Sequence, residues 1–156
     1  MIPPARRRSD TGARDSAARA RRAPAPAKGF QDVRHHAMVA IIDDDDAVRT
    51  ATASLVRSLG LKTSSFASAE EFLHSPRRLD ADCIITDVQM PGMSGLELQA
   101  RLRAGGCRTP LIFITAFPEE HVRRQATAGG AVGFLSKPFD GQAMIACLDA
   151  ALGGIA

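Results

Sequence analysis

The chain has no tryptophan and no tyrosine, and only three cysteines among its 156 residues. It also lacks a continuous apolar run of about 18 residues, which a membrane-spanning helix needs, and its beginning lacks the apolar segment of a secretory signal. Because the cysteines are odd in number and form no C-x-x-C pair, the sequence favours neither a disulfide framework nor a zinc site. Cys83 and Cys147 fall in apolar segments, so we expect core thiols in a cytoplasmic protein.

Positive charge is concentrated at one end of the chain. Residues 1–37 hold nine Lys/Arg and three acids, whereas residues 38–156 hold eleven Lys/Arg and fourteen acids. Large apolar side chains are almost absent from the first segment, so it cannot bury enough surface to offset the entropy of ordering. We therefore expect a disordered basic tail rich in Arg, Ala and Pro over residues 1–37, followed by one folded domain over residues 38–156.

Several interpretations of this tail stay open. It could be a basic arm that touches nucleic acid or an anionic membrane, or a transit peptide, since Arg, Ser and Ala dominate it. It could also be a solvated tail of no fixed role. Met38 directly precedes the first apolar run, where a start codon would stand, so the tail could equally be an over-extended gene start.

Apolar runs and helical spacings alternate along the second segment. Four of these runs predict strands, at residues 38–42, 82–86, 111–115 and 131–135, and the more polar segment 62–66 predicts a fifth, weaker strand at an edge of the sheet. The helical spacings and capping signals predict five helices, at residues 47–59, 68–75, 94–104, 118–128 and 140–152. We expect Asp46 to be the N-cap of the first helix and Pro118 to open the fourth. Strands that alternate with helices predict a doubly wound parallel sheet with helices on both faces.

Unusual polar residues lie at, or just after, the carboxyl ends of four of the five expected strands. They are Asp43 and Asp44, Asp87, Thr115 and Lys137. The carboxyl ends of parallel strands meet at one edge of a sheet, so the three carboxylates would repel one another there. A hard dication such as Mg²⁺ would offset this repulsion, and the backbone carbonyl of Gln89 could be a further ligand.

A carboxylate at such an edge can act as a nucleophile and form an aspartyl phosphate. Asp87 is the candidate, with Mg²⁺ and the Lys137 ammonium neutralising the phosphoryl oxygens and the Thr115 hydroxyl donating to one of them. Each residue also has a plain structural explanation. The acidic run could simply start a helix, Thr115 could end a strand, and Lys137 could be a solvated charge. Their occurrence on successive strand ends favours the site.

Four motifs carry a family resemblance. They are Ile41-Ile42-Asp43-Asp44-Asp45, Thr86-Asp87-Val88-Gln89-Met90-Pro91-Gly92-Met93-Ser94-Gly95, Ile114-Thr115-Ala116 and Lys137-Pro138-Phe139. Together they resemble the receiver domain of two-component response regulators, over residues 38–152 but not 1–37. The resemblance implies the flavodoxin-like fold with strand order 2-1-3-4-5.

The resemblance also implies roles for individual residues. Asp87 would accept a phosphoryl group from a phosphohistidine on a sensor histidine kinase or phosphotransfer protein. Asp44 would bind Mg²⁺ directly, Asp43 mainly through water, and Gln89 through its carbonyl. Thr115 and Phe134 would form a switch pair, and the peptide bond before Pro138 would be cis.

Only residues 153–156 follow the last expected helix, so the sequence leads us to expect a stand-alone receiver without an output domain. Such a receiver would act through a protein target on the face of the fourth helix, fifth strand and fifth helix, or pass phosphate along a relay. A transient homodimer is compatible with it. We expect no nucleic-acid binding by the folded domain, and slow self-dephosphorylation rather than the activity of a dedicated enzyme.

Two alternatives use the same fold. One is a receiver-like interaction module that works without phosphate, although such modules commonly lose one of the residues equivalent to Asp87, Thr115 and Lys137. The other is an enzyme or flavoprotein. A flavin phosphate site would need Ser, Thr or Gly donors after the first strand, where four aspartates would repel an anion. A haloacid-dehalogenase-type hydrolase would need an Asp-x-Asp nucleophile motif there and a separate cap.

Overall fold

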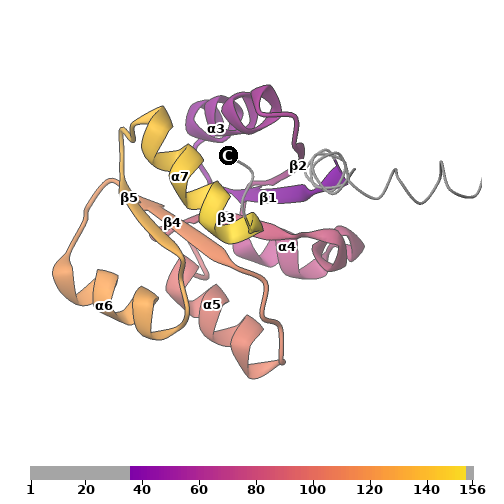
Figure 1. The fold of residues 1–156 in the computed structure, drawn as a ribbon. Coiled ribbons are helices and arrows are strands. Elements are labelled where there is room, and N and C mark those ends of the chain that lie inside the picture. Colours follow the sequence, from indigo (N-terminus) through magenta and orange to yellow (C-terminus); the bar gives the residue numbers. More distant parts are fainter. Residues whose placement is uncertain (1–35, 154–156) are drawn as a thin grey trace, which may run out of the picture. The chain divides into compact units, whose positions relative to one another are not determined.

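The computed structural model describes residues 36–153 and contains one five-stranded parallel sheet. The strands are β1 (Met38–Ile42), β2 (Lys62–Phe66), β3 (Cys83–Asp87), β4 (Leu111–Thr115) and β5 (Gly133–Ser136). Their order across the sheet is β2-β1-β3-β4-β5, and every neighbouring pair is parallel (Figure 1). The expected doubly wound fold and its strand order are therefore confirmed. The expectation for the basic tail lies, up to residue 35, outside the described residues.

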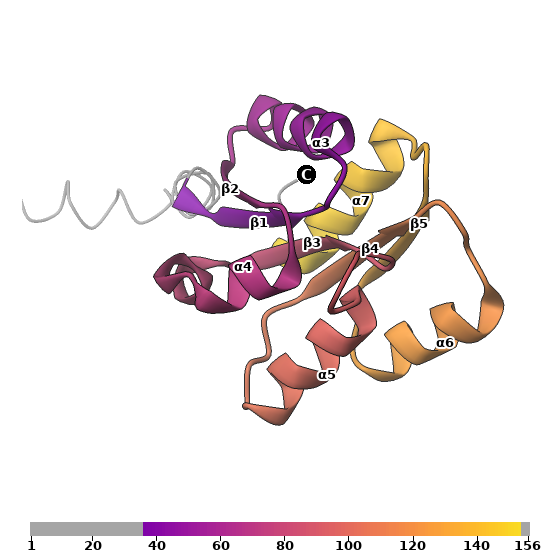
Figure 2. The ribbon, with the colours of Figure 1, turned by 180° about the vertical axis from the view of Figure 1, so that it is seen from behind.

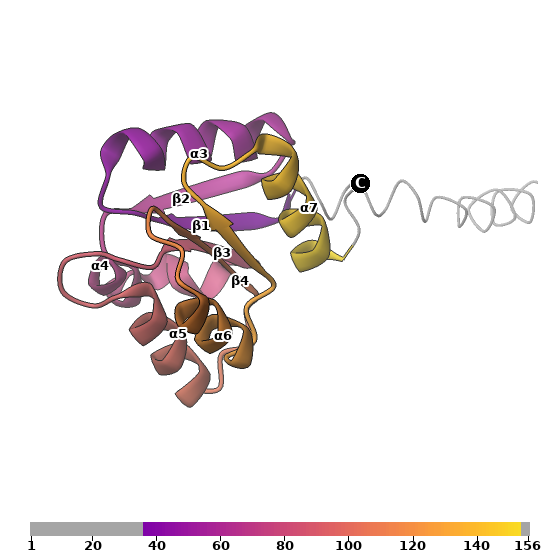
Figure 3. The same ribbon diagram turned by 90° about the vertical axis from the view of Figure 1, so that its left-hand side faces the viewer.

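Six helical segments connect and cover the strands. They are α3 (Asp46–Ser58), α4 (Ala69–His74), the 3₁₀ turn η1 (Pro76–Asp80), α5 (Gly95–Ala104), α6 (Glu120–Ala128) and α7 (Gly141–Leu152). Helices α3 and α7 cover one face of the sheet, and α4, α5 and α6 cover the other (Figures 2 and 3). None of the helices in this described part is long and apolar enough to cross a membrane.

Side chains that alternate along the central strands divide the core between the two faces. On the α3 and α7 face, Ile41 and Ile85 pack with Val56 and Met144. On the other face, Ile84 and Phe113 pack with side chains such as Phe72 and Leu98. The three inner strands are buried on both sides, which explains why their sequences are continuous apolar runs rather than alternating patterns.

Helix boundaries differ from the expectation at two sites. Asp45, rather than Asp46, is the N-cap of α3, because its carboxylate accepts hydrogen bonds from the amides of Ala47 and Val48. Helix α6 begins at Glu120 with Glu119 as the N-cap, so Pro118 lies outside the helix and does not open it. The Phe117 amide donates to the Thr115 hydroxyl at 3.0 Å, which turns the chain after β4 and delays the helix.

Strand boundaries also shift. Strand β3 runs one residue further than expected and includes Asp87, and β5 begins only at Gly133, where pairing with Ile112 starts. The turn η1 was not expected at all. At the other end of the domain, Ala37 is buried and its carbonyl accepts a hydrogen bond from the Lys62 amide at 3.0 Å. Ordered packing thus begins before Met38.

Candidate functional site

The carboxyl ends of β1, β3 and β5 bring two carboxylates and one ammonium group together. Lys137, which directly follows β5, places its Nζ 2.9 Å from Asp87 Oδ2 and 3.1 Å from Asp43 Oδ2. The Asp43 side chain is fully buried, and the side chains of Asp87 and Lys137 are 7% and 16% exposed. Residues that lie far apart in the sequence therefore form one charged centre at the sheet edge.

Asp43 is held in place by the turn that follows β1. Its amide donates to the Phe66 carbonyl on the neighbouring strand at 3.1 Å, and its Oδ1 accepts the Asp45 amide at 2.9 Å. Burial raises the pKa of Asp43 above its ordinary value, and the charge of Asp87 adds to this effect. The Asp45 amide and Lys137 oppose the rise without cancelling it. The buried carboxylate is thus a group that would gain from a further positive charge.

Asp87 ends β3 and is fixed by the loop that follows. Its Oδ1 accepts the Gln89 amide at 3.1 Å, while its Oδ2 accepts Lys137 Nζ. The loop folds back so closely that a Cβ at Gly95 would lie 2.3 Å from the Asp87 carbonyl oxygen. The Gly95 amide also donates to Val88 at 2.8 Å. Glycine is therefore required at this point, where helix α5 begins against the backbone of Asp87.

Lys137 is the shared counter-ion of this centre. Burial lowers the pKa of Lys137, but its close contacts with Asp87 and Asp43 and their negative charges outweigh that effect and raise it above its ordinary value. The amide of Lys137 donates to the Thr115 carbonyl at 2.8 Å, which ties the lysine to the end of β4. The Lys137–Pro138 peptide bond is cis. The lysine thus stays protonated at neutral pH and points at both carboxylates.

Carboxylate oxygens of Asp43, Asp44 and Asp87 lie within 4.8 Å of one another. Asp44 is exposed, whereas the other two side chains are buried. Within residues 36–153, Asp43 Oδ2 has no partner in hydrogen-bond geometry, although Lys137 Nζ lies within ion-pair distance. A buried carboxylate oxygen with a vacant lone pair, beside two more carboxylates, fits a small dication that prefers oxygen ligands, such as Mg²⁺.

Thr115 and Phe134 lie on neighbouring strands beside this centre. Thr115 is buried, and its hydroxyl accepts the Phe117 amide rather than contacting Asp87. Phe134 is half-buried, with its ring centroid 6.5 Å from that of Phe113 and 5.3 Å from the Arg123 guanidinium carbon. The ring is therefore held between an apolar neighbour inside and a cation outside.

The charged residues were expected at the carboxyl edge of the sheet, and the structure brings Asp43, Asp44, Asp87 and Lys137 together there. Gln89 is adjacent through its amide, but its side chain is exposed. The Arg123 contact with Phe134 was not expected, because no local pattern links a helix arginine to a ring on the next strand.

An open parallel sheet that gathers carboxylates and a lysine at its carboxyl edge belongs to the α/β domains with a charged site at the strand ends. The family model described as the response regulator receiver domain matches residues 39–149. The chain therefore belongs to the response regulator receiver domain family, whose members act in two-component signalling.

Named relatives agree with this membership. Transcriptional regulatory protein FixJ of Azorhizobium caulinodans is 46% identical over 115 residues, which cover 74% of this chain and 54% of that protein. Response regulator protein TodT of Pseudomonas putida is 42% identical, with 74% and 51% covered. A response regulator receiver protein from Burkholderia phymatum is 41% identical with a TM-score of 0.65, covering 76% of this chain and 96% of that one. The chain spans about half the length of the curated relatives it matches.

Proposed function

We propose that the domain is a phosphoacceptor switch or relay, in which Asp87 receives the phosphoryl group. A carboxylate oxygen of Asp87 attacks the phosphorus of a phosphohistidine on a sensor histidine kinase or phosphotransfer protein. The new P–O bond forms as the P–N bond breaks, and its electron pair returns to the imidazole nitrogen of the donor. The contact between Lys137 Nζ and Asp87 Oδ2, at 2.9 Å, carries this proposal, because it sets a cation beside the attacking group.

Charge neutralisation is the main catalytic requirement for such a transfer, since the phosphoryl oxygens are negative before and after it. Lys137 would move its hydrogen bond from Asp87 to one of these oxygens. Asp43, Asp44, Asp87 and the carbonyl of Gln89 would hold Mg²⁺, which when bound neutralises further negative charge at the phosphoryl group. The raised pKa of Asp43 supports this assignment, because the buried carboxylate is short of positive charge.

The new phosphoryl group adds about −1.5 to −2 charges at Asp87. The Thr115 hydroxyl, which can also donate a hydrogen bond, would turn from the Phe117 amide toward a phosphoryl oxygen. Phe134 would then rotate into the vacated space beside β4, and the surface formed by α6, β5 and α7 would change for a downstream protein target. Slow self-dephosphorylation would reset the switch.

A groove beside Lys137 is a suitable contact for the phosphodonor. It has a volume of about 320 Å³ between α3 and the loop after β5. Its lining is largely apolar and includes Val48, Ala51, Leu55 and Phe139. A donor protein that packs an apolar side chain here would bring its phosphohistidine to the same edge of the sheet as Asp87. Leu55→Asp should therefore slow transfer from a cognate donor protein, but not from a small acyl phosphate.

Intact-mass measurement after incubation with acetyl phosphate tests the proposal. We expect wild-type protein to gain one phosphoryl group when Mg²⁺ is present and none when a chelator removes it. Asp87→Asn keeps the side-chain shape but not the nucleophile, and should gain none under either condition. Asp46→Asn, which removes an exposed carboxylate from the same acidic run, is the matched control and should behave as wild type. A phosphorylation-independent interaction module would predict no mass gain in any of these proteins.

A further inference from the structure

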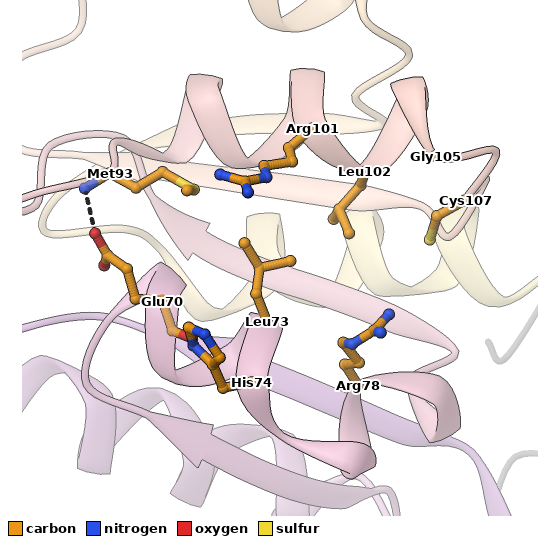
Figure 4. A pocket seen from close by; sticks show the side chains of 9 residues that line it. All are labelled: Glu70, Leu73, His74, Arg78, Met93, Arg101, Leu102, Gly105 and Cys107. Atoms are coloured by element: carbon orange, nitrogen blue, oxygen red, sulfur yellow. Dashed lines mark hydrogen bonds between the residues drawn. The ribbon is translucent and has the colours of Figure 1, made fainter.

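A second recess lies on the opposite side of α5 from α6, between that helix and α4 with η1 (Figure 4). It has a volume of about 350 Å³ and adjoins another of about 360 Å³, and the two linings share Arg78, Leu102, Gly105 and Cys107. We refer to both together as the α4–α5 groove. None of the residues that we assign to phosphoryl transfer lines it.

Two arginines enter the first of these recesses from opposite walls, and a third, Arg108, lines the adjoining one. In Figure 4 the Arg101 side chain extends from α5 toward Met93, and the Arg78 side chain extends from η1 toward α5. Both are exposed, and no carboxylate within residues 36–153 lies within ion-pair distance of either guanidinium group. Leu73 and Leu102 lie between them and form an apolar centre. The first recess thus has one guanidinium group from each wall and apolar side chains between them.

The acid in the groove is already engaged. Glu70 Oε2 accepts the Met93 amide at 2.9 Å, and that hydrogen bond lowers the pKa of Glu70 below its ordinary value. Gly92, with a φ of +78°, allows this contact, since a Cβ there would lie 2.6 Å from the same carboxylate oxygen. Glu70 is therefore a clamp on the loop that follows Asp87 and is not placed to neutralise the arginines.

We propose that the α4–α5 groove is a docking site for an acidic peptide segment of a partner protein, in which two carboxylates flank an apolar side chain. Guanidinium groups bind carboxylates through paired hydrogen bonds, and the leucines would receive the apolar side chain. The exposed Leu79 borders the adjoining recess and extends the apolar surface, since 76% of it is accessible. The chain's own residues 1–35 are unsuited as the occupant, because they hold nine Lys/Arg and only three acids.

Peptide binding to the full-length, unphosphorylated protein tests this proposal independently of phosphoryl transfer. The probe is a fluorescein-labelled peptide of sequence Glu-Leu-Leu-Glu-Leu-Asp with blocked ends, and its control replaces the acids with Gln and Asn. In about 0.15 M salt, where surface charges are screened beyond about 8 Å, we expect saturable binding of the acidic peptide and no such binding of its control. Arg78→Ala and Arg101→Ala should each weaken binding about fivefold, the size of one exposed ion pair.

Arg124→Ala is the matched control, because it removes an exposed arginine of α6 that faces Glu120 instead of the groove. Arg124→Ala should leave the affinity for the acidic peptide unchanged. Any attraction of the peptide to the basic amino-terminal residues is the same in all variants, so it does not affect the comparison. The amide resonance of Met93 should shift on binding, since Glu70 and Met93 line the groove. Equal weakening by Arg124→Ala, or shifts confined to other parts of the domain, would overturn the proposal. So would displacement of the probe by inorganic phosphate at equal concentration, which would indicate a simple anion site.

Discussion

Replacing Lys137 with Met should destabilise the domain because two buried carboxylates would then face each other without a counter-ion. At distances of 2.9 and 3.1 Å, each ion pair of Lys137 has a gross Coulomb energy of about 5 kcal/mol at an effective dielectric constant of about 20. Much of this is offset by the cost of desolvating the ammonium group, and removing one member of a buried pair typically costs 3–5 kcal/mol. Since the Lys137 side chain is still 16% exposed, we expect Lys137→Met to lower the free energy of unfolding by about 3 kcal/mol, which corresponds to roughly 10 °C in Tm.

The loss of stability in Lys137→Met should depend on pH. Burial already raises the pKa of Asp43 in the folded state, and removal of Lys137 should raise it further. A carboxyl group with a raised folded-state pKa contributes stability below its unfolded pKa, and that contribution is lost as pH rises through the folded value. The deficit of Lys137→Met should therefore be largest near about pH 7.5 and shrink toward about pH 5. Added Mg²⁺ should reduce it as well, by supplying positive charge to the same carboxylates.

Thermal unfolding of wild type and Lys137→Met, at both pH values and with either Mg²⁺ or a chelator, measures these effects. Lys62→Met is the control, since Lys62 is an exposed lysine at the start of β2. Its Tm should change little under all conditions. A deficit in Lys137→Met that is the same at both pH values and insensitive to Mg²⁺ would refute the reasoning, because it would show that lost packing dominates.

Further predictions concern metal, switch and tail. Asp44→Ala should weaken Mg²⁺ binding about tenfold, or ~1.4 kcal/mol, and Asp46→Ala should weaken it less. Equal losses in a Mg²⁺ titration would show that the wrong aspartate of the acidic run is assigned as the metal ligand. Phe117 lies two residues after Thr115 and is exposed. If its ring shields the phosphoryl group from water, Phe117→Glu should speed loss of that group in a time course, and an unchanged rate would exclude the shielding. Phosphorylated Thr115→Ala should bind the downstream target at least about fivefold more weakly, whereas wild-type affinity would remove its coupling to Phe134. Deleting residues 1–35 should leave both Tm and phosphoryl uptake unchanged, and a clear fall in Tm would mean that the segment packs on the domain.

Much of the fold and the charged centre follows from local sequence patterns. The three inner strands are apolar runs that end in or precede polar residues, and parallel strands bring their carboxyl ends to one edge. Once the runs before Asp43, Asp87 and Lys137 are recognised as strands of one parallel sheet, the meeting of these side chains follows from the topology. That is why residues far apart in the chain could be assigned to one site.

Other features depend on tertiary contacts that carry no local signal. Asp45 and Asp46 have equal intrinsic preference for an N-cap, and the choice between them follows from the hydrogen bond between Asp43 Oδ1 and the Asp45 amide. The hydrogen bond from Met93 to Glu70 joins the loop after β3 to helix α4, and these segments meet only after folding. The α4–α5 groove likewise arises from packing, because it lies between two helices that were expected separately and the turn η1, which was not expected.

Chemical mapping of the phosphorylated residue tests the central claim most directly. Borohydride reduces an aspartyl phosphate to homoserine, so protein phosphorylated by acetyl phosphate in Mg²⁺, then reduced and digested, should carry homoserine at position 87. Protein treated in a chelator should carry none. Homoserine at Asp43 or Asp44 instead, or phosphate that resists borohydride and lies on a hydroxyl group, would contradict the account. Homoserine at Asp87 alone is the result that it predicts.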